Sequence, residues 1–304
     1  MRNSDELVVR YIRKKNKLRK IITYQDGSAL RQYHERVVDF VSKNTICSTF
    51  AKAYLPGASI YKNALAHLYN DVFIKMDIKD FFLSISHKYM AETLYYEINK
   101  CTTISRRECY EIVERCSTSN KGLPLGLVSS PILANLYLKE FDGLLYGMLK
   151  KLRLDHPIYT RYADDLIISF RYKKDYQKTA QTIENNVADL LRRFSLKVNS
   201  QKTQVVCLKD QNHVRITGIS ITRDADNYRH ISVGRKRKCD LFWNAINMYD
   251  SETKDDEQIA RIKGIYSFVL SVEKKGIDST FSQGMNQLIQ DRGFVSLGEL
   301  IRAL

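Results

Sequence analysis

The sequence of 304 residues is poor in features that mark several protein classes. It has only 4 Pro and 13 Gly, no internal repeat, and no linker rich in Gly, Ser or Pro. No apolar run approaches the roughly 20 residues of a membrane-spanning helix, and residues 1–5 (Met-Arg-Asn-Ser-Asp) do not open a signal peptide. We therefore expect a cytoplasmic protein of one large or two ordinary domains, with an ample core.

The sequence also lacks cysteine motifs, and its acidic residues are fewer than its basic ones. The 6 Cys form no Cys-x-x-Cys pair and have no His at zinc-site spacing, so we expect reduced thiols, mostly in the core. There are 49 Lys+Arg against 34 Asp+Glu, which gives a formal charge of +15. A surplus of positive charge of this size favours a polyanionic partner, and nucleic acid is favoured over an acidic membrane. We expect no membrane partner.

Two adjacent carboxylates, Asp164 and Asp165, stand between apolar residues 158–159 and 166–168. Apolar runs interrupted by a short polar step predict a β-hairpin, here with residues 163–165 at its tip. Adjacent like charges repel each other, which makes physical sense where a cation lies against them. Mg²⁺ takes carboxylate oxygens as ligands. The alternative is an acidic turn that faces water.

A third carboxylate, Asp77, ends a predicted strand over residues 72–77 (Val-Phe-Ile-Lys-Met-Asp). If this strand pairs beside the hairpin, Asp77 and Asp164 meet at one sheet surface. Two metal ions about 4 Å apart could then bridge them, one lowering the pKa of an attacking hydroxyl and the other steadying a leaving phosphate. The alternatives are a solvated acid for Asp77 and a helix or turn cap for Asp80.

Four segments, in this order and spacing, resemble the catalytic motifs of reverse transcriptases. They are residues 75–82 (Lys-Met-Asp-Ile-Lys-Asp-Phe-Phe), 122–136 (Gly-Leu-Pro-Leu-Gly-Leu-Val-Ser-Ser-Pro-Ile-Leu-Ala-Asn-Leu), 161–166 (Arg-Tyr-Ala-Asp-Asp-Leu) and the lysine-bearing 198–203 (Val-Asn-Ser-Gln-Lys-Thr). Residues 63–67 (Asn-Ala-Leu-Ala-His) and 216–218 (Ile-Thr-Gly) are similar to two signatures of bacterial retron enzymes. The resemblance covers roughly residues 10 to 290.

The resemblance implies a right-hand polymerase of the α+β class. Its fingers would span residues 1–70, its palm 71–233 (with part of the fingers) and its helical thumb 234–304, with two helices backing an antiparallel palm sheet. The implied activity is RNA-directed DNA synthesis with Mg²⁺, in a retron or a related antiphage defence system. The implied partners are a structured non-coding RNA that supplies template and priming site, the RNA–DNA duplex, dNTPs and an effector protein. We expect neither an RNase H nor an endonuclease.

The resemblance also assigns roles to single residues. It gives Asp77, Asp164 and Asp165 to the metals and catalysis. It gives Lys202 to proton donation toward pyrophosphate, with an exposed lysine beside Asn199 as the alternative. The dNTP would be bound by Arg19, Lys20, Ile78, Asp80, Phe81, Phe82 and Gly126.

Three of these dNTP-binding residues have more specific implied roles. Arg19 belongs to a basic stretch over residues 10–20, which is more often a solvated face; by the resemblance Arg19 receives the triphosphate. The ring of Phe82 would lie beneath the sugar and exclude a ribose 2′-hydroxyl. Phe81 would pack inward, because consecutive residues of an extended chain point in opposite directions.

The RNA-binding candidates are Asn63, His67, Thr217, Arg235, Lys236, Arg237 and Lys238. The last four open a helical region, and a basic entry suits a thumb that grips a duplex through its phosphates. A separate helical bundle with a charged face is the alternative. For His67 the alternative is a structural hydrogen bond.

Two positions depart from the family pattern. Leu125 stands where the second motif usually has Gln, so a polar contact near the incoming sugar or template is lost; we expect lower fidelity or a restricted, repetitive product. Ile216 replaces Val with similar volume. The alternative assignment is a non-retron defence enzyme that makes repetitive or weakly templated DNA. Phe82 and the Ala-Asp-Asp turn argue against an RNA-dependent RNA polymerase, and the intact carboxylates argue against a non-catalytic RNA-binding module.

Local signals predict further elements. Ser28 caps a helix with an apolar inner face. Ser130 and Pro131 suit the N-cap and first position of a helix that runs to about Leu152. Another helix begins near Asp175, and residues 197–208 return as a strand that carries Lys202.

Overall fold

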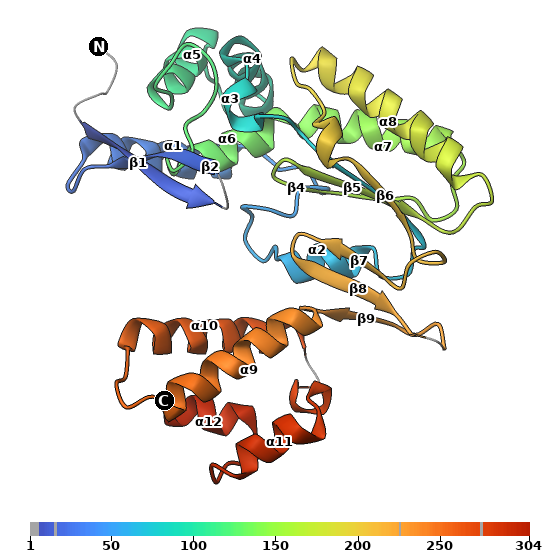
Figure 1. Ribbon diagram of the computed structural model, residues 1–304. Coiled ribbons are helices and arrows are strands. Elements are labelled where there is room, and N and C mark those ends of the chain that lie inside the picture. The colour runs from blue at the N-terminus through green and yellow to red at the C-terminus, as the bar shows by residue number, and fades with distance from the viewer. Residues whose placement is uncertain (1–5, 15–16, 225, 274–275) are drawn as a thin grey trace. The chain divides into compact units, whose positions relative to one another are not determined.

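The computed structural model describes residues 6–14, 17–224, 226–273 and 276–304 (Figure 1). Residues 1–5, on which the expectation about a signal peptide rests, lie outside this range. The chain folds as two compact units, one formed by Met1–Ser59 and Tyr69–Cys207, the other by Ile60–Leu68 and Leu208–Leu304. The segment Ile60–Leu68 therefore belongs with the C-terminal residues. The finer division into fingers, palm and thumb stays a prediction.

The first unit is built on an antiparallel four-stranded sheet. Its strands are β3 (Val72–Asp77), β4 (Ile158–Tyr162), β5 (Asp165–Phe170) and β6 (Gln204–Cys207), in the order β4-β5-β3-β6. The predicted strand over residues 72–77 and the predicted hairpin are both confirmed. The hairpin loop is shorter than predicted, because Asp165 already belongs to β5 and pairs with Tyr162.

Helices and one further hairpin complete this unit. They are β1 (Leu7–Lys14) with β2 (Lys17–Tyr24), α1 (Ala29–Asn44), α3 (Phe81–Ser84), α4 (His87–Ile98), α5 (Arg106–Arg115), α6 (Ser130–Tyr137), α7 (Lys139–Lys151) and α8 (Tyr176–Arg193). Ser28 caps α1 as predicted, since its side chain accepts a hydrogen bond from the backbone N–H of Arg31.

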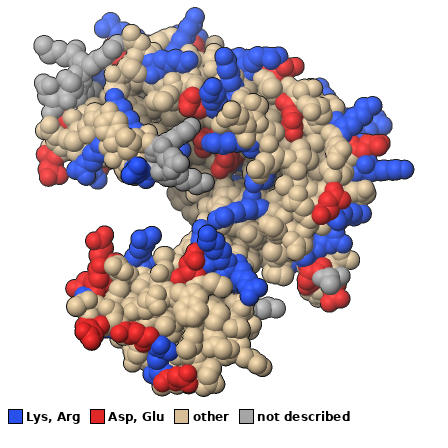
Figure 2. All heavy atoms as spheres, in the orientation of Figure 1, with Lys and Arg blue, Asp and Glu red and all other residues tan. Residues whose placement is uncertain are grey.

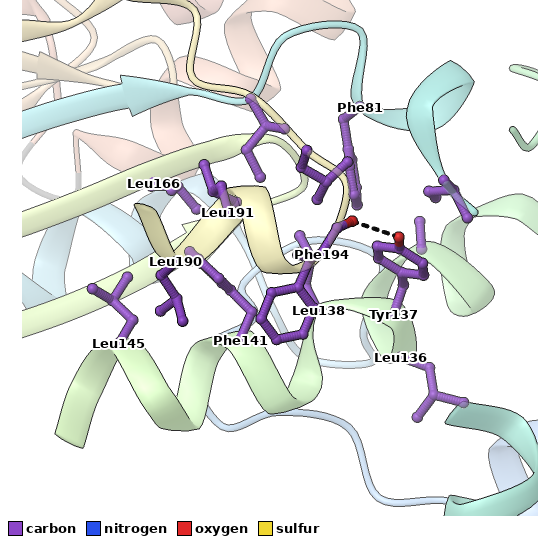
Figure 3. Close-up of a cluster of buried hydrophobic side chains, with 14 of the residues drawn as sticks. Phe81, Leu136, Tyr137, Leu138, Phe141, Leu145, Leu166, Leu190, Leu191 and Phe194 are labelled. Atoms are coloured by element: carbon purple, nitrogen blue, oxygen red, sulfur yellow. Dashed lines mark hydrogen bonds between the residues drawn. The ribbon is translucent and has the colours of Figure 1, made fainter. Parts of the chain in front are cut away.

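The core of the first unit lies between the sheet and helices α7 and α8, which contact each other (Figure 1). The apolar positions of α8 recur at helical spacing and are buried: Ala180, Ile183, Val187, Leu190 and Leu191. Figure 3 shows Leu190 and Leu191 together with Leu145, Phe141 and Phe194 in one cluster. Each such side chain contributes roughly 1.5–3 kcal/mol of burial free energy.

Three local predictions were wrong. The helix expected over residues 130–152 is divided at Leu138 into α6 and α7, and its N-cap is Ser129. Ser130 is instead the first residue of α6, and its hydroxyl donates to the carbonyl of Pro124 at 2.6 Å. Lys202 lies on a 3₁₀ turn, Ser200–Lys202, ahead of β6 instead of within a strand. Phe81 and Phe82 open helix α3, so the extended chain assumed for them is absent.

The second unit combines a small sheet with helices. Strands β7 (His213–Ile216), β8 (Ile219–Arg223) and β9 (Arg229–Ser232) are antiparallel in that order, and the helices are α2 (Ile60–Ala66), α9 (Arg235–Asp250), α10 (Asp256–Val272), α11 (Gln283–Gln290) and α12 (Leu297–Ala303), with a 3₁₀ turn at Asp278–Thr280. Helix α2 contacts all three strands, and α9, α10 and α12 contact one another. The helical region expected after Gly234 is therefore confirmed.

The surface charge, the cysteines and the helices can be compared with what the composition indicated. Figure 2 shows Lys and Arg spread over the visible surface with acidic side chains among them, in keeping with the net charge of +15. All 6 cysteines are free thiols, but only Cys109, Cys116 and Cys207 are buried, so half of them lie in the core where most were expected, and Cys101 is exposed. Among the described helices, none combines the length and apolar character needed to cross a bilayer.

Candidate active site

The pairing of β3 with β5 brings the three predicted carboxylates together. Asp77, the last residue of β3, is the Cα partner of Asp165, the first residue of β5. Asp164 lies in the hairpin loop between β4 and β5, and its carbonyl accepts a hydrogen bond from the N–H of Ile78 at 3.0 Å. The ends of the two central strands and the hairpin loop therefore bring all three carboxylates to one end of the sheet.

The lysine of the fourth motif is the next member of this site. Lys202 Nζ donates to Asp77 Oδ1 at 2.7 Å, and Asn199 Nδ2 donates to Asp77 Oδ2 at 3.0 Å. The backbone N–H of Asn199 also donates to the carbonyl of Asp77 at 2.7 Å. Lys202 keeps 58% of its side chain exposed while Asp77 keeps 9%, so an accessible ammonium group faces a nearly buried carboxylate.

Burial and mutual interactions shift the pKa values of the carboxylates and of Lys202. Burial, together with the negative charges of Asp164 and Asp77, raises the pKa of Asp165 to about 6. Burial also raises the pKa of Asp164, and the charge of Asp77 adds to this rise. The pKa of Lys202 is raised, chiefly by its hydrogen bond to Asp77, so this side chain stays protonated. The site thus carries carboxylates that repel one another and one compensating cation.

The donor set suits a hard divalent cation. Among the described residues, no group of three or more His, Cys, Asp and Glu side chains is arranged as a ready metal centre, and both oxygens of Asp77 are bound by Lys202 and Asn199. Carboxylate oxygens are nevertheless the ligands that Mg²⁺ prefers. Burial and the neighbouring negative charges raise the pKa of Asp164 and Asp165, and a bound cation would offset both effects. These residues therefore fit a metal of this kind.

The loop of the second motif lies against strand β2. The N–H of Ile22 donates to the carbonyl of Leu125 at 2.8 Å. Gly126 has φ of +107°, and a Cβ there would lie 2.4 Å from the carbonyl oxygen of Ile22. Only glycine permits this approach of two backbones. The predicted dNTP-binding residue Gly126 thus also joins the β1–β2 hairpin to the second motif.

Arg19 and Lys20 lie on opposite faces of β2, because consecutive strand residues alternate. Arg19 shares its face with Ile21, whose side chain reaches Gly126. Although burial raises the pKa of Asp164, the positive charge of Arg19 opposes that rise, which puts Arg19 within electrostatic reach of Asp164. The structure therefore brings Arg19 toward the carboxylates, whereas Lys20 lies on the other face of the strand.

The remaining predicted dNTP-binding residues follow Asp77 directly. Ile78 is 1% exposed, so its side chain belongs to the core and only its backbone can serve a ligand. Asp80 is exposed, has φ of +48°, and occupies the N-cap position of α3 without a capping hydrogen bond from its side chain. Phe81 is 2% exposed and lies in the cluster of Figure 3, whereas Phe82 is only partly buried. The inward assignment of Phe81 is thus confirmed, although a helix produces it.

A partly buried chain of hydrogen bonds that sequence patterns did not indicate supports the second motif. The N–H of Val128 donates to the Tyr24 hydroxyl at 3.0 Å, and this hydroxyl lies 2.7 Å from Nδ1 of His34. Nε2 of His34 lies 2.9 Å from the carbonyl of Arg115, which can only accept, so Nε2 carries the proton and Nδ1 accepts from Tyr24. Burial raises the pKa of Tyr24 to about 12, which keeps its hydroxyl available as a donor.

Two signature residues of the retron-like segments meet inside the second unit. Asn63 on α2 donates from Nδ2 to Thr217 Oγ1 at 3.3 Å. Asn63 and His67 are both 0% exposed. Thr217 occupies the β7–β8 loop with φ of +45°, an unusual conformation for a β-branched residue. Asn63 and His67 therefore shape this unit from within, and Thr217 is the member of the set at its surface.

The basic residues at the start of α9 are in unequal environments. Arg235 and Lys236 are exposed, and the Arg237 guanidinium lies over the Phe268 ring at 5.2 Å. Lys238 is 7% exposed and pairs with Glu273 at 3.4 Å, so it does not belong to the exposed basic surface, contrary to its prediction as an RNA contact. Thr217 and Arg237 border one cavity of about 640 Å³ within this unit.

Comparisons with known proteins identify the family. A family model described as reverse transcriptase (RNA-dependent DNA polymerase) matches residues 12–221. The chain is 27% identical over 242 residues to the retron Ec73 reverse transcriptase of Escherichia coli, covering 78% of this chain and 72% of that protein. It is 22% identical over 263 residues to the retron Ec83 reverse transcriptase of the same organism, covering 84% and 80%.

A solved structure shares the fold. Apo telomerase from Candida tropicalis superposes with a TM-score of 0.54 at 12% identity, covering 97% of this chain and 62% of the telomerase chain. At this identity the match concerns the fold alone, which is that of a right-hand polymerase with mixed helices and sheet. The matched residues include all four motifs and the three carboxylates. The chain therefore belongs to the reverse transcriptase family and is an RNA-directed DNA polymerase of the retron type.

Proposed function

We propose that this polymerase copies a structured non-coding RNA into DNA as part of an antiphage system, with Asp77, Asp164 and Asp165 holding two Mg²⁺ ions. The observation that carries the site is the register of β3 and β5, which pairs Asp77 with Asp165 and keeps Asp164 beside Ile78. When bound, the ions would supply a lowered pKa for the attacking hydroxyl and neutralisation of the leaving phosphate.

The chain's own residues would then act on the substrate around these carboxylates. Lys202 carries a proton and is exposed enough to approach the leaving pyrophosphate as its donor. Asn199 orients Asp77 through its side chain and its backbone. Arg19 would receive the triphosphate, because it lies on the face of β2 turned toward Gly126 and within electrostatic reach of Asp164. Lys20 is the weaker candidate for that role.

The choice of deoxyribonucleotides would depend on Phe82. Its ring is partly buried, and it contacts the ring of Phe81 edge to face at 5.3 Å. The carbonyl of Phe82 accepts a hydrogen bond from the N–H of Leu123 at 2.7 Å, which ties it to the second motif. A ring held in this way resists displacement by an added hydroxyl, because close-packed protein opens space only at a cost.

The RNA would bind to the second unit. Arg235 and Lys236 are exposed in the first turn of α9, a turn that contains no acidic residue. Cations at a helix N-terminus are disfavoured by the helix dipole, so their presence there favours a binding role for phosphates. The cavity bordered by Thr217 and Arg237 would adjoin the bound RNA, with Asn63 holding Thr217 from within.

Labelled dNTP incorporation tests this proposal most directly. The protein is purified with its copurifying nucleic acid, assayed with Mg²⁺, and assayed again after ribonuclease treatment. We expect incorporation that ribonuclease abolishes, and sequencing of the copurified RNA should yield one structured species whose complement is found in the DNA product. Incorporation that persists unchanged after ribonuclease treatment would contradict a bound RNA template.

Leu125 favours a second candidate, a defence reverse transcriptase that makes repetitive or weakly templated DNA. Its side chain is apolar and half-buried where the family pattern has Gln, and its carbonyl is already bound by Ile22. The loop is thus held in place by its backbone while a polar side-chain contact is missing. Product sequence separates the two candidates: a defined complement of the RNA supports the first, and a short repeat supports the second.

A further inference from the structure

A buried charged network lies directly behind the hairpin that carries Asp164. Arg161 on β4 and Asp142 on α7 are both 0% exposed. Arg161 Nε and Nη2 donate to the two oxygens of Asp142 at 2.9 and 2.8 Å. The Tyr159 hydroxyl donates to the same carboxylate at 2.7 Å. This pair is hydrogen-bonded in the bidentate geometry that arginine alone among the cations can offer.

The other donors of Arg161 reach two further segments. Nη1 donates to Asn135 Oδ1 at 3.0 Å and to the carbonyl of Ala163 at 3.3 Å, and Nη2 donates to the carbonyl of Asn135 at 3.3 Å. Together with Asp142, these acceptors use all five N–H groups of the guanidinium. Asn135 lies on α6 in the second motif, and its Nδ2 donates to the carbonyl of Ala53 at 2.8 Å. One side chain therefore joins the second motif, helix α7 and the hairpin of the third motif.

The contact with Ala163 is the one that bears on catalysis. Ala163 is the first residue of the two-residue hairpin loop and has φ of +56°, a conformation that two-residue loops require and that a residue with a Cβ adopts only at a cost. Its carbonyl shares a planar peptide unit with the N–H of Asp164. Fixing the orientation of that carbonyl therefore fixes the backbone from which the Asp164 side chain departs.

We propose that Arg161 is a positioning residue for DNA synthesis: it holds the Ala163 carbonyl, and through it the strained loop that aims Asp164 into the active site. The inference rests on the proposed catalytic role of Asp164. A buried ion pair is not needed for stability alone, since apolar residues of similar volume serve a core equally well. What apolar residues cannot provide is a donor to the carbonyl of Ala163.

The test compares Arg161→Lys with Ser169→Ala in the full chain with its copurified RNA. Lysine keeps the positive charge opposite Asp142 but cannot reach Asp142, Asn135 and Ala163 together. Ser169 lies near the far end of β5, buried, where its hydroxyl accepts from Asn70 at 2.8 Å, so its loss perturbs the same sheet away from the loop. Thermal unfolding, single-turnover incorporation and Mn²⁺ binding followed by the EPR signal of the free ion are measured for each variant.

We expect Arg161→Lys to lower the single-turnover rate by roughly 10²-fold, as misplacement of a catalytic group by about 1 Å does, with little change in the dNTP concentration at half-maximal rate. Mn²⁺ binding should weaken, a readout that needs no turnover. Ser169→Ala should lower the melting temperature and leave both the rate and Mn²⁺ binding near those of the parent. Equal losses of rate and Mn²⁺ binding in the two variants would overturn the proposal.

A rescue variant makes the test specific to the loop. Because glycine adopts a positive φ without a steric penalty, adding Ala163→Gly to Arg161→Lys should restore part of the rate and of the Mn²⁺ affinity. Absence of any recovery would overturn the role assigned to the Ala163 carbonyl. If Arg161→Lys does not fold, Arg161→Met with Asp142→Leu removes both charges, and a folded but slow enzyme is expected; a folded enzyme with the parental rate would overturn the proposal.

Asp164→Asn separates this inference from the proposed function. If Asp164→Asn retains activity, the proposed metal site itself fails. If Asp164→Asn is inactive while folded Arg161→Lys synthesises DNA at the parental rate, only the positioning role of Arg161 fails.

Discussion

Asn63 donates a hydrogen bond from Nδ2 to Thr217 Oγ1 at 3.3 Å, although 154 residues separate the two along the chain. This bond joins helix α2 to the loop between β7 and β8, and it unites the two retron-like signatures in one structural unit. The Oδ1 atom of Asn63 is buried and, among the described residues, has no hydrogen-bond partner. A buried polar atom without a partner costs free energy, which favours a functional reason for keeping it.

RNA recognition should therefore depend on Asn63 and His67 more than generic synthesis does. We expect Asn63→Ala to weaken binding of the cognate RNA about 10-fold or more, because Thr217 loses the hydrogen bond that supports it from within. His67→Ala should weaken the same binding, because His67 is buried in the same unit and its loss opens a cavity there. Filter binding of that RNA is compared with incorporation on an unrelated primed template. Equal losses in both assays would mean that these residues serve only the stability of the unit.

Removing a carboxylate of the active site should abolish synthesis without unfolding the protein. Asp77→Asn or Asp164→Asn preserves side-chain shape but removes an anionic ligand, and a rate loss of about 10³-fold or more is expected. Asp71→Asn is the matched control: it lies just before β3, where its carboxylate accepts from the N–H of Tyr172 at 2.9 Å. Near-normal incorporation by either active-site variant, measured with folding confirmed by circular dichroism, would refute the metal assignment.

The two consecutive phenylalanines, Phe81 and Phe82, should differ in their effect on sugar selection. Phe82→Ala opens space beside the proposed nucleotide site, so ribonucleotides should be incorporated while dNTP use is largely kept. Phe81 is 2% exposed, and Phe81→Ala should instead lower the free energy of unfolding by about 3–5 kcal/mol without changing sugar choice. Competition between matched dNTP and rNTP measures the first effect, and urea unfolding measures the second. A Phe82→Ala enzyme that rejects ribonucleotides as its parent does would remove the steric role.

The buried His34 should make the protein sensitive to acid. Burial lowers the pKa of His34 below its ordinary value near 6.5, and the charge of Arg115 lowers it further. The hydrogen bond to the Arg115 carbonyl and the charge of Glu6 raise this pKa, but the net shift is downward. Above pH 6.5 both folded and unfolded chains hold a neutral imidazole. As the pH falls below 6.5 only the unfolded chain gains the proton, so stability should fall by up to about 1.4 kcal/mol per pH unit until the lower folded pKa is reached.

The corresponding experiment compares His34→Gln with the parent by urea unfolding between pH 7.5 and about 5. Glutamine can donate to the Arg115 carbonyl and accept from Tyr24, yet it does not titrate, so the slope below pH 6.5 should become shallower. His213→Gln, at an exposed position on β7, serves as the control. An unchanged slope in His34→Gln would assign the acid sensitivity to other groups.

Sequence patterns predicted the parts of the site that are local. Strand alternation and the polar step at Asp164 and Asp165 correctly indicated β3 and the hairpin, because periodicity and turn chemistry depend on neighbouring residues. The position of Lys202 on a 3₁₀ turn was missed, since a short turn before a four-residue strand leaves no periodic signal. The resemblance still identified Lys202, and the structure brings it to Asp77.

Features that depend on tertiary packing could not be predicted from local sequence patterns. Arg161 follows apolar residues in a strand, and a single charge there indicates neither burial nor a partner; Asp142 lies 19 residues away on another element. No Gly or Pro near Leu138 signals the division of the predicted helix there, and the burial of Lys238 involves Glu273 on a distant segment. The chain from Val128 through Tyr24 to His34 joins three segments that no local pattern relates.

The identity of the DNA product should depend on Leu125. Its carbonyl is fixed by the N–H of Ile22, so a substitution changes the side chain while the backbone stays in place. Because Leu125 is half-buried, glutamine of similar length can direct its amide outward without opening a cavity.

Leu125→Gln should therefore raise incorporation on ordinary heteropolymer templates several-fold, by roughly the free energy of one added hydrogen bond, and should lower the error rate. Sequencing of products from parent and variant on the same primed template measures both effects. Leu125→Ala is the control, since it shortens the side chain without adding a polar group and should not improve fidelity. An unchanged product sequence and error rate in Leu125→Gln would show that the apolar residue does not limit templating.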